Sequence, residues 1–344
     1  MSARAAATRK DAGADAAALP TELLHECPLC GSGALRHWRT GYDRSHLMSE
    51  RRFRYARCRD CGLRFLKTRP RETDMRAFYP ATYYAAPAAA PEPPAGDRRD
   101  TRPNRLEPWL ARLNKRIDEA IPDTLPSRLR DLYRPYREGD MLLDYGCGSD
   151  VFLNWARARG WGTIGVDVSE RVVASVRASG HRGLLVRPSL WSEIADGELA
   201  LVRVNHVVEH LYNPRSVLGA ILRKLRPGGV LHLATPNPAS VFSTLLRSRW
   251  LGLDCPRHVM LYPPSALARL CREIGFGRVD VAHEVLTKDL ARSLGYVLHD
   301  LGRVPHSGIL AMAERRKLAD ALHVPARLAA RLGASDRFHC FAVR

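Results

Sequence analysis

The chain has 344 residues, of which 45% are hydrophobic, and a formal net charge of +18 at pH 7. This length suffices for one large α/β domain and a smaller module, and no run approaches the roughly 20 apolar residues that cross a bilayer. Residues 1–22 are rich in alanine and charged side chains and lack the apolar core of a secretory signal. We therefore expect a disordered tail over 1–22 and a cytoplasmic protein.

Positive charge is concentrated near the start of the chain, where residues 27–84 carry 13 Lys and Arg against 5 Asp and Glu. This balance is compatible with an anionic partner such as RNA or a nucleotide-linked substrate. A simpler interpretation is a set of solvated arginine faces, because the sequence contains no RNA-binding signature with interleaved aromatic residues. Both interpretations stay open at this point.

Two CxxC pairs predict a zinc site in a ribbon-like module over residues 23–84. Cys27 and Cys30 form CPLCG, and Cys58 and Cys61 form CRDCG. Each pair occupies a tight turn that aims two thiolates at one point, and the two turns together complete a tetrahedron. A cytoplasmic setting argues against disulfides. We expect the zinc to be structural, because four protein ligands leave no open coordination position.

An aromatic segment, FYPATYY (78–84), ends this module and can dock it on the rest of the chain. Residues 85–103 are rich in Ala, Pro and Gly and predict a flexible linker. Residues 104–137 have the apolar spacing of helices, and internal prolines divide them into two or three short ones.

The segment 141–170 is the most informative part of the sequence. An apolar strand ends in Asp144, a glycine turn with Gly146 and Gly148 follows, and after a helical segment a second apolar strand ends at Asp167. This order, in which a strand, a glycine turn and a helix precede a second strand that ends in an acidic residue, is typical of the first half of a nucleotide-binding α/β unit. A carboxylate at the position of Asp167 can accept hydrogen bonds from ribose hydroxyls.

The sequence DYGCG in this turn resembles the first motif, (D/E)xGxGxG, of class I S-adenosylmethionine (SAM) dependent methyltransferases, whereas a dinucleotide enzyme more often shows GxGxxG. The resemblance implies an α/β fold with a Rossmann-like seven-stranded sheet, helices on both faces, and SAM as cofactor. It also implies a set of cofactor-binding residues, namely Asp144, Tyr145, Gly146, Cys147, Gly148, Asp167, Val168, Ser189, Leu190 and Asn205.

Two residues near this set, Asp150 and Trp191, have two interpretations each. Asp150 stands where the family motif has its third glycine, and it either favours the positive end of a helix or contacts the ligand. Ser189 falls near the usual acidic adenine contact, which this sequence lacks. Trp191 either stacks on the adenine ring or belongs to the core.

Two later passages are similar to methyltransferases related to ubiquinone biosynthesis. One is NHVVEHLYNPRSVLGAILRKLRPGGVLHLATPNP, which follows a strand at 199–204, and the other is CPRHVMLYPPSALARLCREIGF, at 255–276. The segment 78–84 is similar to one that follows the four-cysteine unit in a group of bacterial SAM methyltransferases. The resemblance to the ubiquinone-related methyltransferases implies a sixth strand over 278–285 and an antiparallel seventh strand over 338–343. Between them we expect a helical insertion over 286–335 that shapes the acceptor pocket.

Methyl transfer depends largely on positioning, and an acceptor that bears a proton also needs a base. His206, Glu209 and His210 share one face if their segment is helical, at the carboxyl end of the fourth strand. His210 is the candidate base or substrate-orienting group, with His258 as the second candidate. Alternatively the first three residues hold a divalent metal, as two acids and a histidine do in some ubiquinone-pathway O-methyltransferases, or they only start a helix.

These observations predict a SAM-dependent methyltransferase domain over 104–344, including a helical cap over 104–137, preceded by the zinc module. The expected acceptor is a small molecule such as a sugar, a lipid-linked compound or a secondary-metabolite intermediate. One alternative is an RNA methyltransferase whose basic zinc module grips phosphates. A second alternative is a non-catalytic binding or scaffold protein that kept the fold, to which Asp150 and the missing adenine acid point.

Overall fold

The computed structural model describes residues 19–80, 83 and 108–344. Residues 1–18 of the expected tail and the whole linker predicted over 85–103 lie outside the described residues. Thr21 and Glu22, also expected in the tail, form part of a strand that pairs with residues of the N-terminal module. The boundary predicted at residue 23 is therefore too late.

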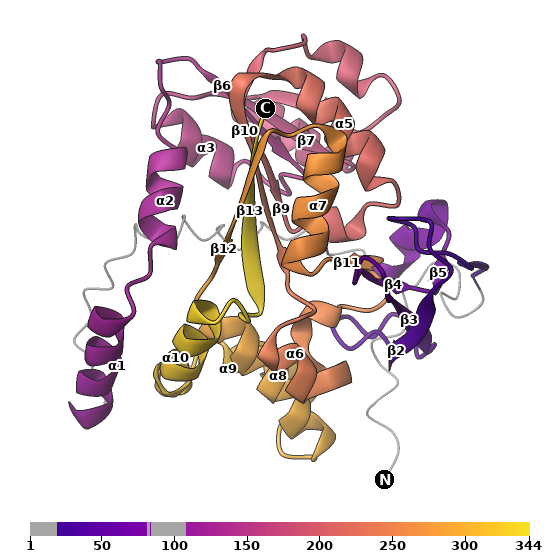
Figure 1. Cartoon of the computed structure of the whole chain (residues 1–344), viewed down its shortest axis with the longest axis vertical. Coiled ribbons are helices and arrows are strands. Elements are labelled where there is room, and N and C mark those ends of the chain that lie inside the picture. The colour runs from indigo at the N-terminus through magenta and orange to yellow at the C-terminus, as the bar shows by residue number, and fades with distance from the viewer. Residues whose placement is uncertain (1–18, 81–82, 84–107) are drawn as a thin grey trace.

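The larger part of the chain forms a seven-stranded sheet (Figure 1). Its strands are, in spatial order, β12 (Arg278–His283), β13 (Arg337–Val343), β10 (Leu225–Pro236), β9 (Leu199–Asn205), β6 (Met141–Tyr145), β7 (Gly162–Asp167) and β8 (Arg182–Leu185). Neighbouring strands are parallel, except that β13 runs antiparallel to β10 and β12. The predicted Rossmann-like sheet is confirmed. The chain order reverses between β6 and β9, and such sheets bind ligands outside the carboxyl ends of the strands at the reversal.

Helices cover both faces of this sheet. Buried side chains of α5 (Pro214–Lys224) and α7 (Pro264–Ile274) join the main hydrophobic core. Those of α2 (Leu125–Leu132) and α3 (Val151–Arg157) belong to a second cluster that includes Leu142, Leu201 and Phe341 of the sheet. The remaining α-helices of the described residues are α1 (Pro108–Ala120), α4 (Glu170–Ala178), α6 (Val241–Leu246), α8 (Thr287–Asp300), α9 (Ile309–Met312) and α10 (Arg316–Arg331).

Local sequence signals explain where several of these helices begin and end. Asn213 accepts a hydrogen bond from the N–H of Ser216 at the start of α5, whose first residue is Pro214. Gly275 ends α7 with φ +116°, the left-handed conformation that glycine adopts readily. The helices predicted over 104–137 and 286–335 are present where described. None of the helices in the described part of the chain has the length and apolar character that a bilayer crossing requires.

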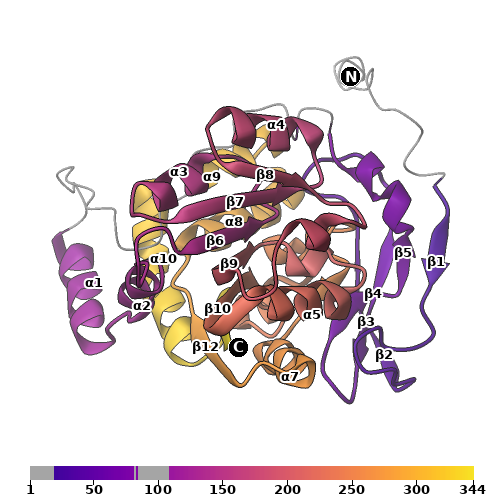
Figure 2. The same cartoon turned by 90° about the horizontal axis from the view of Figure 1, so that it is seen from above.

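The N-terminal strands lie beside the main sheet as two small sheets (Figure 2). One pairs β1 (Thr21–Leu23) with β5 (Thr68–Pro70), and the other contains β2 (Leu35–Gly41), β3 (Phe53–Cys58) and β4 (Arg64–Leu66). A 3-10 helix, η1 (Glu72–Phe78), follows. The fourth strand of the second small sheet is β11 (Met260–Leu261), which comes from the C-terminal half of the chain. Leu63 and Phe65 also share the main core with Ile221, so the module and the larger domain are folded on one another.

Candidate active site

The glycine turn after β6 leaves no room for a side chain at its first glycine. Gly146 has φ +74°, and a Cβ atom placed on it would lie 2.4 Å from Val207 Cγ2. Gly148 has φ +64° but open space around its Cβ position. The backbone here can approach a ligand closely. The Gly146 contact also places the turn directly against the segment that follows β9.

Replacing Gly146 by alanine is expected to lower the free energy of unfolding by about 2–4 kcal/mol, because the new methyl group meets Val207. Gly148→Ala is the matched control, since it has a similar left-handed backbone without that contact and is expected to lose about 1–2 kcal/mol. Urea unfolding of the two variants measures the difference. Equal losses would contradict the role of the Val207 contact.

Asp167 ends β7 beside the turn and is 5% exposed. Its carboxylate accepts hydrogen bonds from the backbone N–H of Gly148 and of Ser169, each at 2.9 Å. Burial raises the pKa of Asp167, and these backbone hydrogen bonds oppose the rise. The residue therefore fixes the turn, while the carboxylate keeps lone pairs that ribose hydroxyls can use.

Asp144, two residues before the turn, is fully buried and already engaged. Arg203 Nη1 donates to both of its carboxylate oxygens at 2.9 Å. Burial raises the pKa of Asp144, and the arginine opposes the rise. Arg203 is not among the residues predicted from the motifs, although a charged residue within the apolar strand LALVRV is a visible signal. This ion pair links β6 to β9, and a direct contact of Asp144 with a cofactor stays a prediction.

The side chain of Asp150 is held by protein groups at the start of α3. It accepts hydrogen bonds from Asn154 Nδ2 at 3.0 Å and from Ser179 Oγ. These contacts favour the helix-start interpretation over a ligand contact. They also explain how an acid is accommodated where the family motif has glycine.

Tyr145 and Trp191 stack on each other, with ring centroids 5.8 Å apart and planes within 5° of parallel. Trp191 packs against the main core as a partly buried residue, so one face of its ring has a core role. The other predicted cofactor residues differ in exposure: Leu190 is buried, Cys147 and Asn205 are half-buried, and Val168 and Ser189 are exposed.

Three candidate catalytic residues converge just after β9. Glu209, His210 and His258 each offer one potential metal-ligand atom, and these atoms lie within 4.8 Å of one another. His258 Nε2 is 3.9 Å from Glu209 Oε1, and the two histidine ring centroids are 4.8 Å apart. His258 comes from the loop before β11, far along the chain. The structure therefore brings both predicted base candidates into one cluster.

His206, Glu209 and His210 do not lie on one continuous helix. Only Val208–His210 form a short 3-10 turn, η3, and His206 has φ +56°. A left-handed backbone at a non-glycine residue turns the chain sharply and prevents a continuous helix. His206 Nδ1 still reaches Glu209 Oε1 at 3.3 Å, but His258 replaces His206 in the group that could hold a metal.

Backbone carbonyls orient both histidine rings of the cluster. The Nδ1–H of His210 donates to the carbonyl of Arg257 at 3.0 Å, and that of His258 donates to the carbonyl of Gly252 at 2.8 Å. These hydrogen bonds assign the tautomers and leave Nε2, rather than Nδ1, as the ring atom that can accept a proton. Burial, with a further effect from His258, lowers the pKa of His210 to about 4. His210 is therefore neutral at pH 7.

Glu209 is a fully buried carboxylate beside the two rings. Its oxygens interact with His206 Nδ1 at 3.3 Å and accept a hydrogen bond from Thr235 Oγ1 at 2.9 Å. Burial alone would raise the pKa of Glu209, but the hydrogen bond with His206 and the nearby charges of His206, His258 and His210 together outweigh it and lower the pKa to about 2. The ionised carboxylate stabilises a positive charge that forms on a neighbouring imidazole.

The aromatic segment that ends the N-terminal module reaches this cluster. The hydroxyl of Tyr79 is 3.4 Å from His210 Nδ1, and the rings of Tyr79 and Tyr83 are 4.8 Å apart. The guanidinium carbon of Arg257 is 5.9 Å from the Tyr79 ring centroid. The N-terminal module thus supplies one aromatic wall of the site, as the prediction of a docking segment requires.

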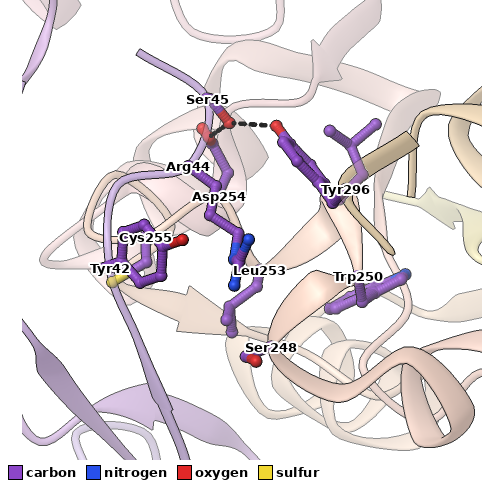
Figure 3. Close-up of a pocket in the computed structure, with 10 residues that line it drawn as sticks. Tyr42, Arg44, Ser45, Ser248, Trp250, Leu253, Asp254, Cys255 and Tyr296 are labelled. Carbon is purple, nitrogen blue, oxygen red and sulfur yellow. Dashed lines mark hydrogen bonds between the residues drawn. The ribbon is translucent and has the colours of Figure 1, made fainter. Parts of the chain in front are cut away.

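A small pocket next to the cluster lies between the N-terminal module and α8 (Figure 3). Within it, Ser45 Oγ donates to Asp254 Oδ1 at 2.6 Å and lies 3.2 Å from the hydroxyl of Tyr296. Asp254 Oδ2 is 3.9 Å from His258 Nε2. The cavity volume of about 10 Å³ corresponds to about one water molecule, so this pocket alone does not hold a methyl acceptor.

The four predicted metal-ligating cysteines form a single cluster. The Sγ atoms of Cys27 and Cys61 are 3.5 Å apart, those of Cys30 and Cys58 are 3.6 Å apart, and all four lie within 4.8 Å of one another. A tetrahedral Zn²⁺ with Zn–S bonds of about 2.3 Å separates its sulfur ligands by about 3.8 Å. The four thiols therefore fit a closed zinc site.

Comparison with known proteins agrees with this geometry. The sequence model of a family described as "Methyltransferase domain" matches residues 101–281, which is more than half of the chain. The "Ubiquinone biosynthesis O-methyltransferase" of Aromatoleum aromaticum is 31% identical over 150 residues, which cover 40% of this chain and 64% of that relative. The protein of the same name from an Azoarcus species is 28% identical over 181 residues, covering 47% and 77%.

Solved structures give a weaker likeness. A SAM dependent methyltransferase from Archaeoglobus fulgidus is 18% identical, with a TM-score of 0.41 over 68% of this chain and 94% of the other. One from Mesorhizobium loti is also 18% identical, with a TM-score of 0.42 over 66% of this chain and 100% of the other. The family match, the seven-stranded sheet and the glycine turn together are decisive. The chain belongs to the methyltransferase domain family and is a SAM-dependent methyltransferase.

Proposed function

We propose that this methyltransferase transfers the methyl group of SAM to a small-molecule acceptor, with His210 as the base. The observation that carries the proposal is the position of the histidine–glutamate cluster. Val207, which touches Gly146 of the glycine turn, lies three residues before His210. The residues proposed to bind SAM and those proposed to activate the acceptor are therefore adjacent at the carboxyl ends of β6 and β9.

The residues of the turn fit SAM. Asp167 would accept hydrogen bonds from the ribose, and the backbone from Tyr145 to Gly148 would contact the methionine part. Val168, Ser189 and Leu190 would lie along the adenine, and Asn205 near the sulfonium side. Bound SAM supplies an electrophilic methyl group on a positively charged sulfur.

The residues of the chain then act on the acceptor. His210 is neutral at pH 7 and keeps its Nδ1–H on the Arg257 carbonyl, so Nε2 is the atom that takes the acceptor proton. Glu209 stabilises the imidazolium that results, and His258 is the alternate base. Tyr79 and Tyr83 would contact the acceptor. An oxygen acceptor agrees with the O-methyltransferase name of the two relatives.

The pH dependence of kcat/KM tests the assignment of His210. The base must be unprotonated, and burial lowers its pKa to about 4, below the ordinary value near 6.5. We expect kcat/KM to stay level between pH 7 and about 5 and to fall only near pH 4. An acid limb at the ordinary histidine pKa would contradict the assignment. Because the folded pKa lies below the unfolded one, His210 also contributes a loss of stability as pH falls from 6.5 towards 4.

Zinc in the four-cysteine cluster is proposed to be structural. The cluster offers four thiolates and no open position, which is the ligand set of a structural rather than a catalytic site. Glu209, His210 and His258 are a chemically different set, suited to a transition metal. If a metal binds there, it would polarise the acceptor in place of a base.

Label transfer identifies the class of acceptor. SAM carrying a tritiated methyl group is incubated with the protein and either a panel of hydroxylated small molecules or total RNA. We expect the label in a small-molecule product that is soluble in acid, and we expect the His210→Gln variant to form no such product. Label in RNA alone would contradict the proposal of a small-molecule acceptor.

One observation favours RNA as the second candidate substrate. Arg36, Arg57 and Arg64 stand directly opposite one another across β2, β3 and β4. Like charges at opposed positions destabilise a sheet, and no carboxylate in the described part of the chain forms an ion pair with Arg36 or Arg57. Burial lowers the pKa of Arg64 to about 10, and the nearby positive charges of Arg57 and Arg36 add to this effect. Phosphates would reach the exposed Arg36 and the half-buried Arg57 of this row, whereas Arg64 is buried.

The salt dependence of binding decides between the two candidates. If the arginine row holds RNA, the logarithm of the binding constant falls with the logarithm of salt concentration by about 0.7 per phosphate contacted. Arg36→Gln should then lower that slope. If the protein does not bind RNA even at low salt, RNA is excluded as the substrate.

A further inference from the structure

The loop that carries His258 is folded on the N-terminal module rather than on its own domain alone. The hydroxyl of Tyr55 donates to the carbonyl of His258 at 3.0 Å. The N–H of Leu66 donates to the carbonyl of Val259 at 2.9 Å. The next two residues form β11 and pair with β4. Every residue from 258 to 261 is thus bonded to, or paired with, the strands that flank Cys58 and Cys61.

Arg257, next to His258, is a buried cation that joins the two parts of the chain. It is 1% exposed. Its Nη2 atom donates to Asp43 Oδ1 at 2.8 Å and to Asp254 Oδ1 at 2.7 Å, and its Nη1 atom donates to the carbonyl of Phe78 at 2.8 Å. Asp43 and Phe78 belong to the N-terminal module, and Asp254 belongs to the larger domain. The guanidinium therefore fixes the loop against the module.

The same residue orients the proposed base. The carbonyl of Arg257 accepts the Nδ1–H of His210, so the ring follows the position of this backbone. Asp254, held by Arg257 and by Ser45 of the module (Figure 3), lies 3.9 Å from His258 Nε2. Both histidines are thus linked to the module through one buried arginine.

We infer that Arg257 is a positioning residue for methyl transfer and that the four-cysteine module, through Asp43, holds His210 and His258 in the orientation that proton transfer requires. This inference rests on the proposed role of His210. It assigns the N-terminal module a part in the chemistry in addition to its own folding. A displacement of about 1 Å at a reacting group can cost up to about 100-fold in rate, so loss of the link is expected to reduce turnover.

A double-mutant cycle tests the inference. Asp43→Asn removes the charge that faces Arg257 from the module and leaves the pair with Asp254 in place. We expect kcat to fall about 10- to 100-fold, with the dissociation constant of SAM unchanged within about twofold. In the His210→Gln background the same substitution should have a much smaller effect, because the proposed base that Arg257 orients is no longer present. Equal effects of Asp43→Asn in both backgrounds would overturn the inference.

The control and a second variant keep the test decisive. Glu22→Gln removes another ion pair of the module, with Arg69, that does not reach the histidines, and kcat should stay unchanged. If Asp43→Asn fails to fold, Ser45→Ala removes the module's hydrogen bond to Asp254 with a smaller change, and kcat should fall at least about threefold. Unchanged kcat in that variant would also overturn the inference. If His210→Gln alone leaves kcat unchanged, it is the proposed base that fails.

Discussion

The His210→Gln variant is expected to lose about 10²- to 10⁴-fold in kcat, the range that a general base contributes. The loss has a direct physical reason: glutamine keeps the size and polarity of the side chain but accepts no proton from the acceptor. The KM for SAM should change little, because the glycine turn and Asp167 are untouched. Steady-state methyl transfer at saturating SAM measures both quantities.

A matched control separates this loss from a general effect of removing a histidine. His299 of α8 also contacts a backbone carbonyl through its ring, that of Val304 at 3.0 Å, away from the cluster. His299→Gln should leave kcat unchanged. If His210→Gln retains normal turnover while His258→Gln loses it, the base is His258, and if both retain it, neither histidine removes the proton.

Removal of zinc is the second change with a large expected effect. Structural zinc contributes about 10–16 kcal/mol to the folding of isolated zinc modules, and here the module shares the main core with the larger domain. We expect Cys58→Ala to lose the metal and to lower the melting temperature by about 10 °C or more. Metal content and thermal unfolding of the purified protein are the measurements.

Cys271→Ala provides the comparison, because Cys271 is buried but lies outside the four-cysteine cluster. It should keep one zinc per chain even if its own packing loss lowers stability. Zinc retained in Cys58→Ala, or a wild-type protein purified without zinc and fully stable, would contradict a structural zinc site.

Much of the fold follows from local pattern. The strand, glycine turn and helix around Gly146 have a fixed order of residue types, and the two CxxC turns have a fixed spacing, so both can be recognised over short stretches. The strand order of the sheet was available only through the family resemblance. The antiparallel strand β13 was anticipated on the same basis.

The remaining features depend on contacts between distant segments. The loop that brings His258 to His210 leads into β11, which pairs with β4, and a strand of two residues leaves no periodicity to detect. The spacing of His206 and His210 suggested a helix, but a left-handed residue at the end of β9 interrupts it. The sequence alone does not distinguish Arg203 and Arg257 from the other arginines, because the role of a buried charge depends on the acidic residue with which it pairs in the fold.

Titration of the zinc-loaded protein with SAM tests the central claim, that the turn and Asp167 form the cofactor site. We predict micromolar binding by the wild type and a loss of about 100-fold or more in Asp167→Ala, while Asp196→Asn, at an exposed carboxylate paired with Lys224, binds normally. Circular dichroism confirms that each variant is folded. Equal binding by wild type and Asp167→Ala, or no binding by the folded wild type, would contradict the account.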